Sequence, residues 1–221
     1  MKLGQIQVKL YQIRYELLLL SLISVFVLNT FFPTNYFEDK IQGITFTLQV
    51  LAGMNVMFKS KKIFGGFIMF VGIAALTIRY LYIFQVIDNP NLISFLYLFL
   101  FSGLSSEVFK EMYHAEIINR KIIYAAICGL LLLGYSGFFV FAAIEHIQPY
   151  SFKGLSPGND GINDLFYYSF ISIMTVGYGD ICPVSWTAKN ATMFVNLISY
   201  VYSLVIVSII VSQFTSNRRR R

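Results

Sequence analysis

Charged side chains are scarce in this sequence. Asp, Glu, Lys and Arg occupy 13% of the 221 positions, whereas hydrophobic residues occupy 57%. A soluble domain usually carries about 25% charged residues. Because the uncharged positions form long runs that a water-soluble chain would have to bury completely, the composition excludes an ordinary soluble domain and indicates a membrane protein.

Cysteine and histidine are equally rare, with two of each. Cys128 falls in an apolar run and Cys182 in a loop, so we expect no disulfide between them within one chain. His114 and His146 fall on opposite sides of a predicted membrane span. An enzyme embedded in the membrane would need ionisable groups that converge at one depth, so we expect neither enzymatic activity nor an organic cofactor.

Six apolar runs approach the roughly 20 residues that a helix needs to cross a bilayer. All are uncharged through their middles except the third, which contains Arg79. Short polar connections join most of them, while the segment 145–186 is longer and rich in Pro and Gly. The runs predict an all-α membrane protein with six transmembrane helices, at 15–32, 41–58, 63–87, 91–107, 122–144 and 188–214.

Basic residues predict the orientation of these helices. With the N-terminus in the cytoplasm, thirteen of the seventeen Lys and Arg residues lie on the cytoplasmic side, where membrane proteins concentrate them. The net charge of +6 then follows from topology, and it predicts contact with anionic lipid rather than with nucleic acid. We expect a multi-pass protein of the cell membrane with both termini cytoplasmic. The thirteen residues are Lys2, Lys9, Arg14, Lys59, Lys61, Lys62, Lys110, Arg120, Lys121, Arg218, Arg219, Arg220 and Arg221.

The segment 164–183 combines a half-length apolar run with a glycine-rich loop. Residues 165–174 are too few to cross a bilayer, so this run must enter the membrane and turn back. Gly177 and Gly179 suit an extended loop whose carbonyls all point to one side, because that geometry requires positive φ angles that glycine adopts at little cost. Asn163 and Asp164 are expected at the start of the short helix, as a cap and a favourable negative charge.

The sequence TVGYGD at 175–180, with a short helix before it and Pro183 and a long apolar helix after it, resembles the pore of potassium channels. The resemblance covers 122–214, and the whole chain looks like a prokaryotic-type six-helix channel. In that family, four copies of such a loop form rings of carbonyl oxygens that replace the hydration shell of K⁺. The resemblance therefore implies a homotetramer whose selectivity filter binds K⁺. The filter residues would be Thr175, Val176, Gly177, Tyr178 and Gly179, with K⁺ held at the first four.

The same reading divides the chain into five segments. We expect a cytoplasmic N-terminus at 1–14, a four-helix transmembrane domain at 15–107, an interfacial linker helix at 108–121, a pore domain at 122–214 and a basic cytoplasmic tail at 215–221. Ser105 or Ser106 is expected to cap the linker helix. Its apolar side would comprise Val108, Phe109, Met112, Tyr113 and Ile117. The residues after 214 predict no cytoplasmic ligand-binding domain within this chain.

Four positions depart from the family pattern or match it only in part. Met174 stands where many members have Thr, and Tyr167 and Tyr168 stand where many have a Trp pair. The resemblance implies that Tyr167 hydrogen-bonds Asp180 behind the filter, although aromatic packing alone would also explain it. Glu145 matches an acidic residue that braces the filter in voltage-gated relatives, or is an interfacial carboxylate.

The last apolar run carries a row of polar residues. Asn196, Ser199 and Ser203 are spaced i, i+3, i+7 and so share one helix face. Polar residues within a membrane span usually face a bundle interior or water. We expect this face to line the pore, the alternative being hydrogen bonds between helices.

The fourth run takes the place of a voltage sensor but contains no basic residue from 91 to 106. We therefore expect that voltage is not the main gate; lipid, pH, membrane tension and a partner subunit stay open. Arg79 is expected to be an interfacial anchor or the partner of a carboxylate. Two other functions stay open: a subunit of a potassium transporter, which would normally carry four half-helix repeats in one chain, and a non-conducting regulatory channel subunit.

Overall fold

The computed structural model describes residues 9–31, 42–58, 60, 62–86, 89–115, 119–157 and 160–219. Its regular secondary structure is α-helical apart from two strands of two residues each, and turns and loops connect these elements. It forms two compact units, one made of 1–88 with 103–129 and the other of 89–102 with 130–221. Two helices, α6 (Pro90–Tyr113) and α7 (Arg120–Ile147), contribute residues to both units.

The first unit is built on three successive helices, α2, α4 and α5, with α4 packed against both others. Arg14 at the start of α2 is only 7% exposed and forms an ion pair with Glu111 near the end of α6. The hydroxyl of Tyr15 donates to the same carboxylate, and the guanidinium lies 4.1 Å from the ring centroid of Tyr11. A buried charge is tolerated because it is paired in this way. The three helices are α2 (Arg14–Phe31), α4 (Gln42–Met57) and α5 (Lys62–Ile83).

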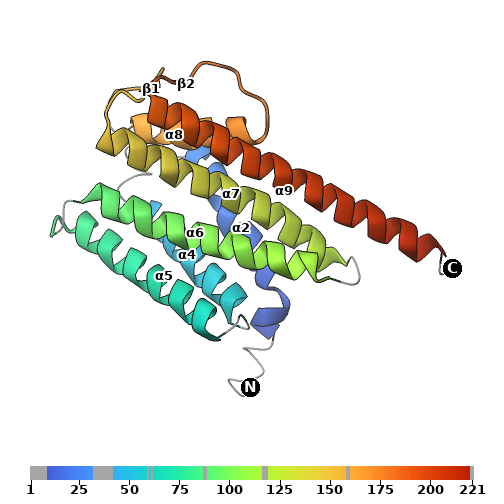
Figure 1. Ribbon diagram of the computed structural model, residues 1–221. Helices are drawn as coiled ribbons and strands as arrows, with labels where there is room; N and C mark the ends of the chain where they lie inside the picture. The colour runs from blue at the N-terminus through green and yellow to red at the C-terminus, as the bar shows by residue number, and fades with distance from the viewer. Residues whose placement is uncertain are drawn as a thin grey trace. The chain divides into compact units, whose positions relative to one another are not determined.

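The second unit contains the segment that resembles a pore. Its short helix α8 and the strands β1 and β2 lie at one end of α7 and α9 (Figure 1). Contacts between aromatic rings join its helices. The ring centroids of Phe101 on α6 and Tyr135 on α7 are stacked 4.9 Å apart, and Tyr135 meets Phe166 on α8 edge-on at 5.4 Å. The remaining elements are β1 (Phe152–Lys153), α8 (Asp160–Ile173), β2 (Cys182–Pro183) and α9 (Trp186–Arg219).

Five helices in the described part are long and apolar enough to cross a membrane, at 14–31, 63–83, 90–113, 120–147 and 186–209. The remaining predicted span, 41–58, is the second along the chain and corresponds to α4, an apolar helix of only 16 residues. At 1.5 Å per residue it is about 24 Å long, against a hydrocarbon core of about 30 Å. The structure is therefore consistent with an all-α membrane protein that has five candidate spans, and the six-span topology stays a prediction.

The connection between α6 and α7 differs from the linker helix expected at 108–121. Asn89 caps the start of α6, since its side chain accepts a hydrogen bond from the backbone N–H of Leu92, and the helix runs without a break from Pro90 to Tyr113. No new helix is capped at Ser105 or Ser106. Val108 and Met112, expected on the apolar side of a separate helix, belong to α6 and are fully buried. Val108 and Met112 are four residues apart and so lie on one face of α6. Burial of this face keeps α6 helical through both positions. Residues 116–118, which include Ile117, lie outside the described residues.

Candidate functional site

Helix α8 ends directly in the TVGYGD loop, and a Schellman motif makes the transition. The backbone N–H of Val176 donates to the carbonyl of Ile171 at 2.9 Å, and that of Thr175 donates to Ser172 at 3.0 Å. This pair of hydrogen bonds requires a left-handed residue at Thr175, whose φ is 59°. Glycine usually takes that place, and a β-branched residue there costs about 1–3 kcal/mol. The strain falls on the first residue of the predicted filter, where the residue type does not indicate a left-handed backbone.

The loop itself has φ angles of alternating sign. Gly177 and Gly179 have φ angles of 56° and 81°, as expected from the sequence, while Val176 and Tyr178 are not in the positive-φ region. Together with Thr175, every second residue from 175 to 179 is therefore left-handed. Such alternation is the backbone pattern that can turn successive carbonyls to the same side. Within this chain a Cβ on Gly177 would meet nothing within 4 Å, so the demand for glycine comes from φ.

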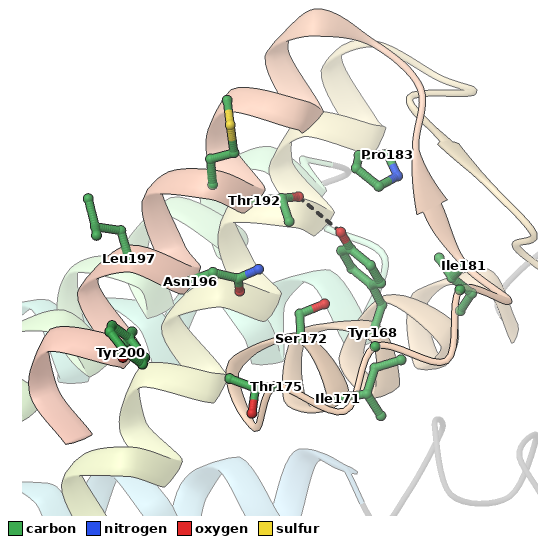
Figure 2. A pocket seen from close by; sticks show the side chains of 13 residues that line it. Tyr168, Ile171, Ser172, Thr175, Ile181, Pro183, Thr192, Asn196, Leu197 and Tyr200 are labelled. Atoms are coloured by element: carbon green, nitrogen blue, oxygen red, sulfur yellow. Dashed lines mark hydrogen bonds between the residues drawn. The ribbon is translucent and has the colours of Figure 1, made fainter. Parts of the chain in front are cut away.

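The loop residues are exposed in the single chain. Val176 and Tyr178 are 49% and 74% exposed, and Thr175, Gly177 and Gly179 are exposed as well. An open groove of about 630 Å³ runs from this loop along α9. In Figure 2, the side chain of Asn196 extends from α9 toward α8, and Tyr168 and Thr192 face each other across the groove.

The three polar residues predicted to line the pore do not share one environment. Asn196 borders the groove, and no described residue hydrogen-bonds its Oδ1 atom. Ser199 is only 1% exposed and is covered by its own chain. Ser203 is half-buried and donates a hydrogen bond to the carbonyl of Ser199 at 3.0 Å. Ser199 therefore does not reach the groove, because the face of α9 that carries it packs against the rest of the unit.

Tyr167 and Asp180 are joined as the resemblance implied. The hydroxyl of Tyr167 on α8 donates a hydrogen bond to Asp180 Oδ2 at 2.9 Å, and the backbone N–H of Ile181 donates to Oδ1 at 3.1 Å. Both carboxylate oxygens are thus used locally. This bond ties the middle of α8 to the residue that follows the TVGYG sequence.

A second tyrosine contact was not predicted. The hydroxyl of Tyr168 lies 3.1 Å from Oγ1 of Thr192 and so links α8 to α9 (Figure 2). Leu165, three residues before Tyr168 and so on the same side of α8, is fully buried, so this face is the one that packs. The only signal in the sequence was the tyrosine hydroxyl itself.

Within the single chain, the hydrogen bonds of Glu145 go to the segment after α7 and not to the TVGYGD loop. Its carboxylate, in the last turns of α7, accepts hydrogen bonds from the backbone N–H groups of Tyr150 and Phe152, at 2.7 and 3.2 Å. It therefore organises the segment that follows α7. That segment in turn pairs with the residues after the loop, since β1 and β2 are antiparallel, with Phe152 opposite Pro183.

Helix α8 begins at Asp160, three residues before the start expected at Asn163 and Asp164. Asp164 accepts a hydrogen bond from the backbone N–H of Ser156 at 2.6 Å, so it stabilises the preceding loop and does not cap the helix. With 14 residues, about 21 Å long, α8 remains too short to cross a bilayer.

The oxygen ligands that residues 175–179 offer are their backbone carbonyls and the hydroxyls of Thr175 and Tyr178, while the Asp180 carboxylate is hydrogen-bonded to Tyr167 and Ile181. Among the described residues, no group of three or more His, Cys, Asp or Glu side chains could hold a metal ion. A monovalent cation bound at the loop would therefore rely on neutral oxygens.

Residues 126–216 match the model of a family described as ion channel. The match takes in most of α7, all of α8, the TVGYGD loop and most of α9. No curated protein and no solved structure matches the chain. The family match supports an ion channel, and with the five apolar helices it supports an integral membrane protein.

Proposed function

We propose that this chain is one subunit of a homotetrameric channel that conducts K⁺ selectively. The observation that carries the proposal is the loop at 175–179, where φ alternates in sign at the end of a half-length helix. In the channels that it resembles, loops of this sequence surround K⁺ with carbonyl oxygens in place of water. Thr175 adds a hydroxyl at one end of the loop, and Asp180 adds a carboxylate at the other.

Several copies of the chain are needed because one loop cannot surround an ion. Each subunit supplies one carbonyl per ring, so four subunits related by a closed rotation supply four. The exposure of Val176 and Tyr178 in the single chain supports this assembly, since both side chains would otherwise be left on an apolar surface in contact with water. The groove beside α9 would be covered by a neighbouring copy.

Helix α8 also favours a cation by its direction. A helix carries a partial negative charge at its C-terminus, which here is the end that enters the loop. Four such ends around one axis would lower the energy of K⁺ at the inner mouth of the filter. We further propose that the cytoplasmic side is the one that carries Lys110 and Arg120, and that anionic lipid contacts it.

The test is electrical recording from the purified protein in planar bilayers, with potassium on one side and sodium on the other. A reversal potential close to the potassium equilibrium potential is expected. Equal permeability for the two ions would refute potassium selectivity, and coupled, non-channel transport would favour the transporter alternative. Absence of current in every condition would favour a non-conducting subunit. The mass of the assembly in detergent, expected to be four times the 25.3 kDa of one chain, tests the stoichiometry.

Replacing Gly177 by Ala provides a variant of the filter itself. Alanine disfavours the left-handed φ of this position, so conduction or selectivity should be lost. Gly66→Ala is the matched control. It lies in α5, and a Cβ there would meet nothing within 4 Å.

A further inference from the structure

The residues that follow the TVGYG sequence pair with the segment at the end of α7. We call the two paired segments, 145–154 and 180–185, the clasp. Three links join its two halves: the β1–β2 pairing, the carbonyl of Ser151, which accepts from the N–H groups of Val184 and Ser185 at 2.7 and 3.2 Å, and the approach of Gly154 to Asp180. The clasp thus fixes the position of the backbone just after the filter.

The first half of the clasp is itself anchored. The Glu145 carboxylate accepts the N–H groups of Tyr150 and Phe152. Phe152 is 4% exposed, and its ring packs 5.6 Å from Phe141 on α7 and 5.4 Å from Tyr168 on α8. Ser151 is fully buried. Because these contacts involve side chains of α7 and α8, the segment 150–154 cannot shift without disturbing its packing against the two helices.

Gly154 is the point of closest approach. A Cβ built on this residue would overlap the carbonyl oxygen of Asp180 and lie 3.1 Å from its carbonyl carbon. Its φ of 93° is also one that residues with a side chain rarely adopt. Both features require glycine, and the neighbouring atoms are backbone, which cannot move aside as a flexible side chain would.

We propose that the clasp positions the outer end of the filter, and that Gly154 is a positioning residue for ion conduction. The inference rests on the proposed function of the loop. Asp180 is held on one side by the Tyr167 hydroxyl and on the other by the backbone at Gly154. A side chain at position 154 displaces the Asp180 backbone, and the displacement passes directly to Gly179, the last residue of the filter.

The experiment compares wild type, Gly154→Ala and Glu145→Gln in planar bilayers. Glutamine keeps the size of Glu145 but turns an N–H₂ group toward one of two N–H donors, so it loosens the clasp without adding volume. Both variants are expected to form the assembly of the wild type, to lose current several-fold faster during maintained conduction and to recover at high external potassium. Ions that occupy a filter stabilise its conducting form by mass action. An unchanged amount of assembly in detergent distinguishes this effect from a general loss of stability.

Gly66→Ala is the control and should behave as the wild type. If Gly154→Ala does not assemble, Glu145→Gln decides the question. The proposal would be overturned if current in Glu145→Gln decays at the wild-type rate. It would also be overturned if the faster decay in either variant does not depend on external potassium. Neither result would contradict a potassium-selective wild-type channel. A wild type that does not discriminate potassium from sodium would instead refute the proposed function, and the clasp proposal with it.

Discussion

The hydroxyl of Ser169 on α8 donates a 2.7 Å hydrogen bond to the carbonyl oxygen of Gly134 on α7, in a buried environment. The two helices can come this close because Gly134 and Gly137 have no side chains. A Cβ on Gly134 would overlap the ring of Phe170, and one on Gly137 would lie 2.6 Å from Ser169 Oγ. The position of α8, and of the loop that follows it, therefore depends on small residues of α7.

Replacing Gly134 by Ala is expected to destabilise the protein more than replacing Ser169 by Ala. Overpacking a close helix contact typically costs about 1–3 kcal/mol, whereas loss of one neutral hydrogen bond costs about 1 kcal/mol. Thermal unfolding of the purified protein in detergent measures both, with Gly66→Ala as the control for the glycine substitution. If Gly134→Ala unfolds at the wild-type temperature, the two helices do not depend on this close approach.

Tyr167→Phe removes the hydroxyl that Asp180 accepts and keeps the ring. Because Asp180 then loses one of its two hydrogen-bond donors, we expect less stable conduction with little change in assembly. Recordings under potassium gradients and size-exclusion chromatography measure the two properties separately. Wild-type conduction in Tyr167→Phe would show that this tyrosine serves only as packing.

Cysteine substitutions along α9 test which residues reach the groove. In a Cys182→Ser background, Asn196→Cys should react with a small charged thiol reagent added from the cytoplasmic side, and the reaction should reduce the current. Ser199→Cys should stay unreacted, since Ser199 is 1% exposed within its own chain. Fast modification of Ser199→Cys combined with an inert Asn196→Cys would mean that the pore-lining part of this face is centred on Ser199 and not on Asn196.

The ion pair of Arg14 with Glu111 predicts a double-mutant cycle in stability. Removing one partner from a buried pair leaves an uncompensated charge, so Arg14→Ala and Glu111→Ala should each lower the unfolding temperature. The double variant should be less destabilised than the sum of the two. Glu111 is partly exposed, which limits the size of the effect. Strict additivity would show that the pair contributes nothing beyond its separate side chains.

The sequence predicted the apolar helices, the half-length helix and the left-handed glycines because each depends on local composition. Long apolar runs admit few structures in a membrane, and positive φ is available at low cost to glycine. Helix boundaries were less predictable. Ser105 and Ser106 carry the chemistry of an N-cap, but burial of Val108 and Met112 keeps α6 continuous through them. Tertiary packing thus overrode a local signal.

Contacts between distant segments could not be predicted from the sequence. Nothing at Gly154 indicates that it meets Asp180, since the two are brought together by the pairing of β1 with β2. The left-handed Thr175 was missed for a related reason. It follows from two hydrogen bonds at the end of α8, and the residue type argues against it. Ser199 shares a helix face with Asn196 by spacing, but the helix periodicity cannot say where the buried part of that face ends.

The last prediction is that membrane voltage will have little effect on opening. Moving one elementary charge across the membrane potential is worth about 2.3 kcal/mol per 100 mV, and steep gating takes about three to four such charges in each of four subunits. In α6, which would occupy the sensor position, the only basic residue from Pro90 to Tyr113 is Lys110, in the last turn and 3.7 Å from Glu107. Helix α6 therefore has no row of basic residues on which the membrane field could act.

Arg79 on α5 is the other cation to consider. Its guanidinium lies 4.7 Å from the ring centroid of Phe46 on α4, a contact that favours a fixed position. Even if it moved fully, one Arg79 per subunit would supply at most about four charges to a tetramer, a third or less of what steep gating takes. Open probability measured against voltage in symmetric potassium should therefore be flat or change gradually. A steep sigmoid that requires about ten or more charges would mean that the field acts on an element other than α6, and Arg79→Gln would show whether α5 is that element.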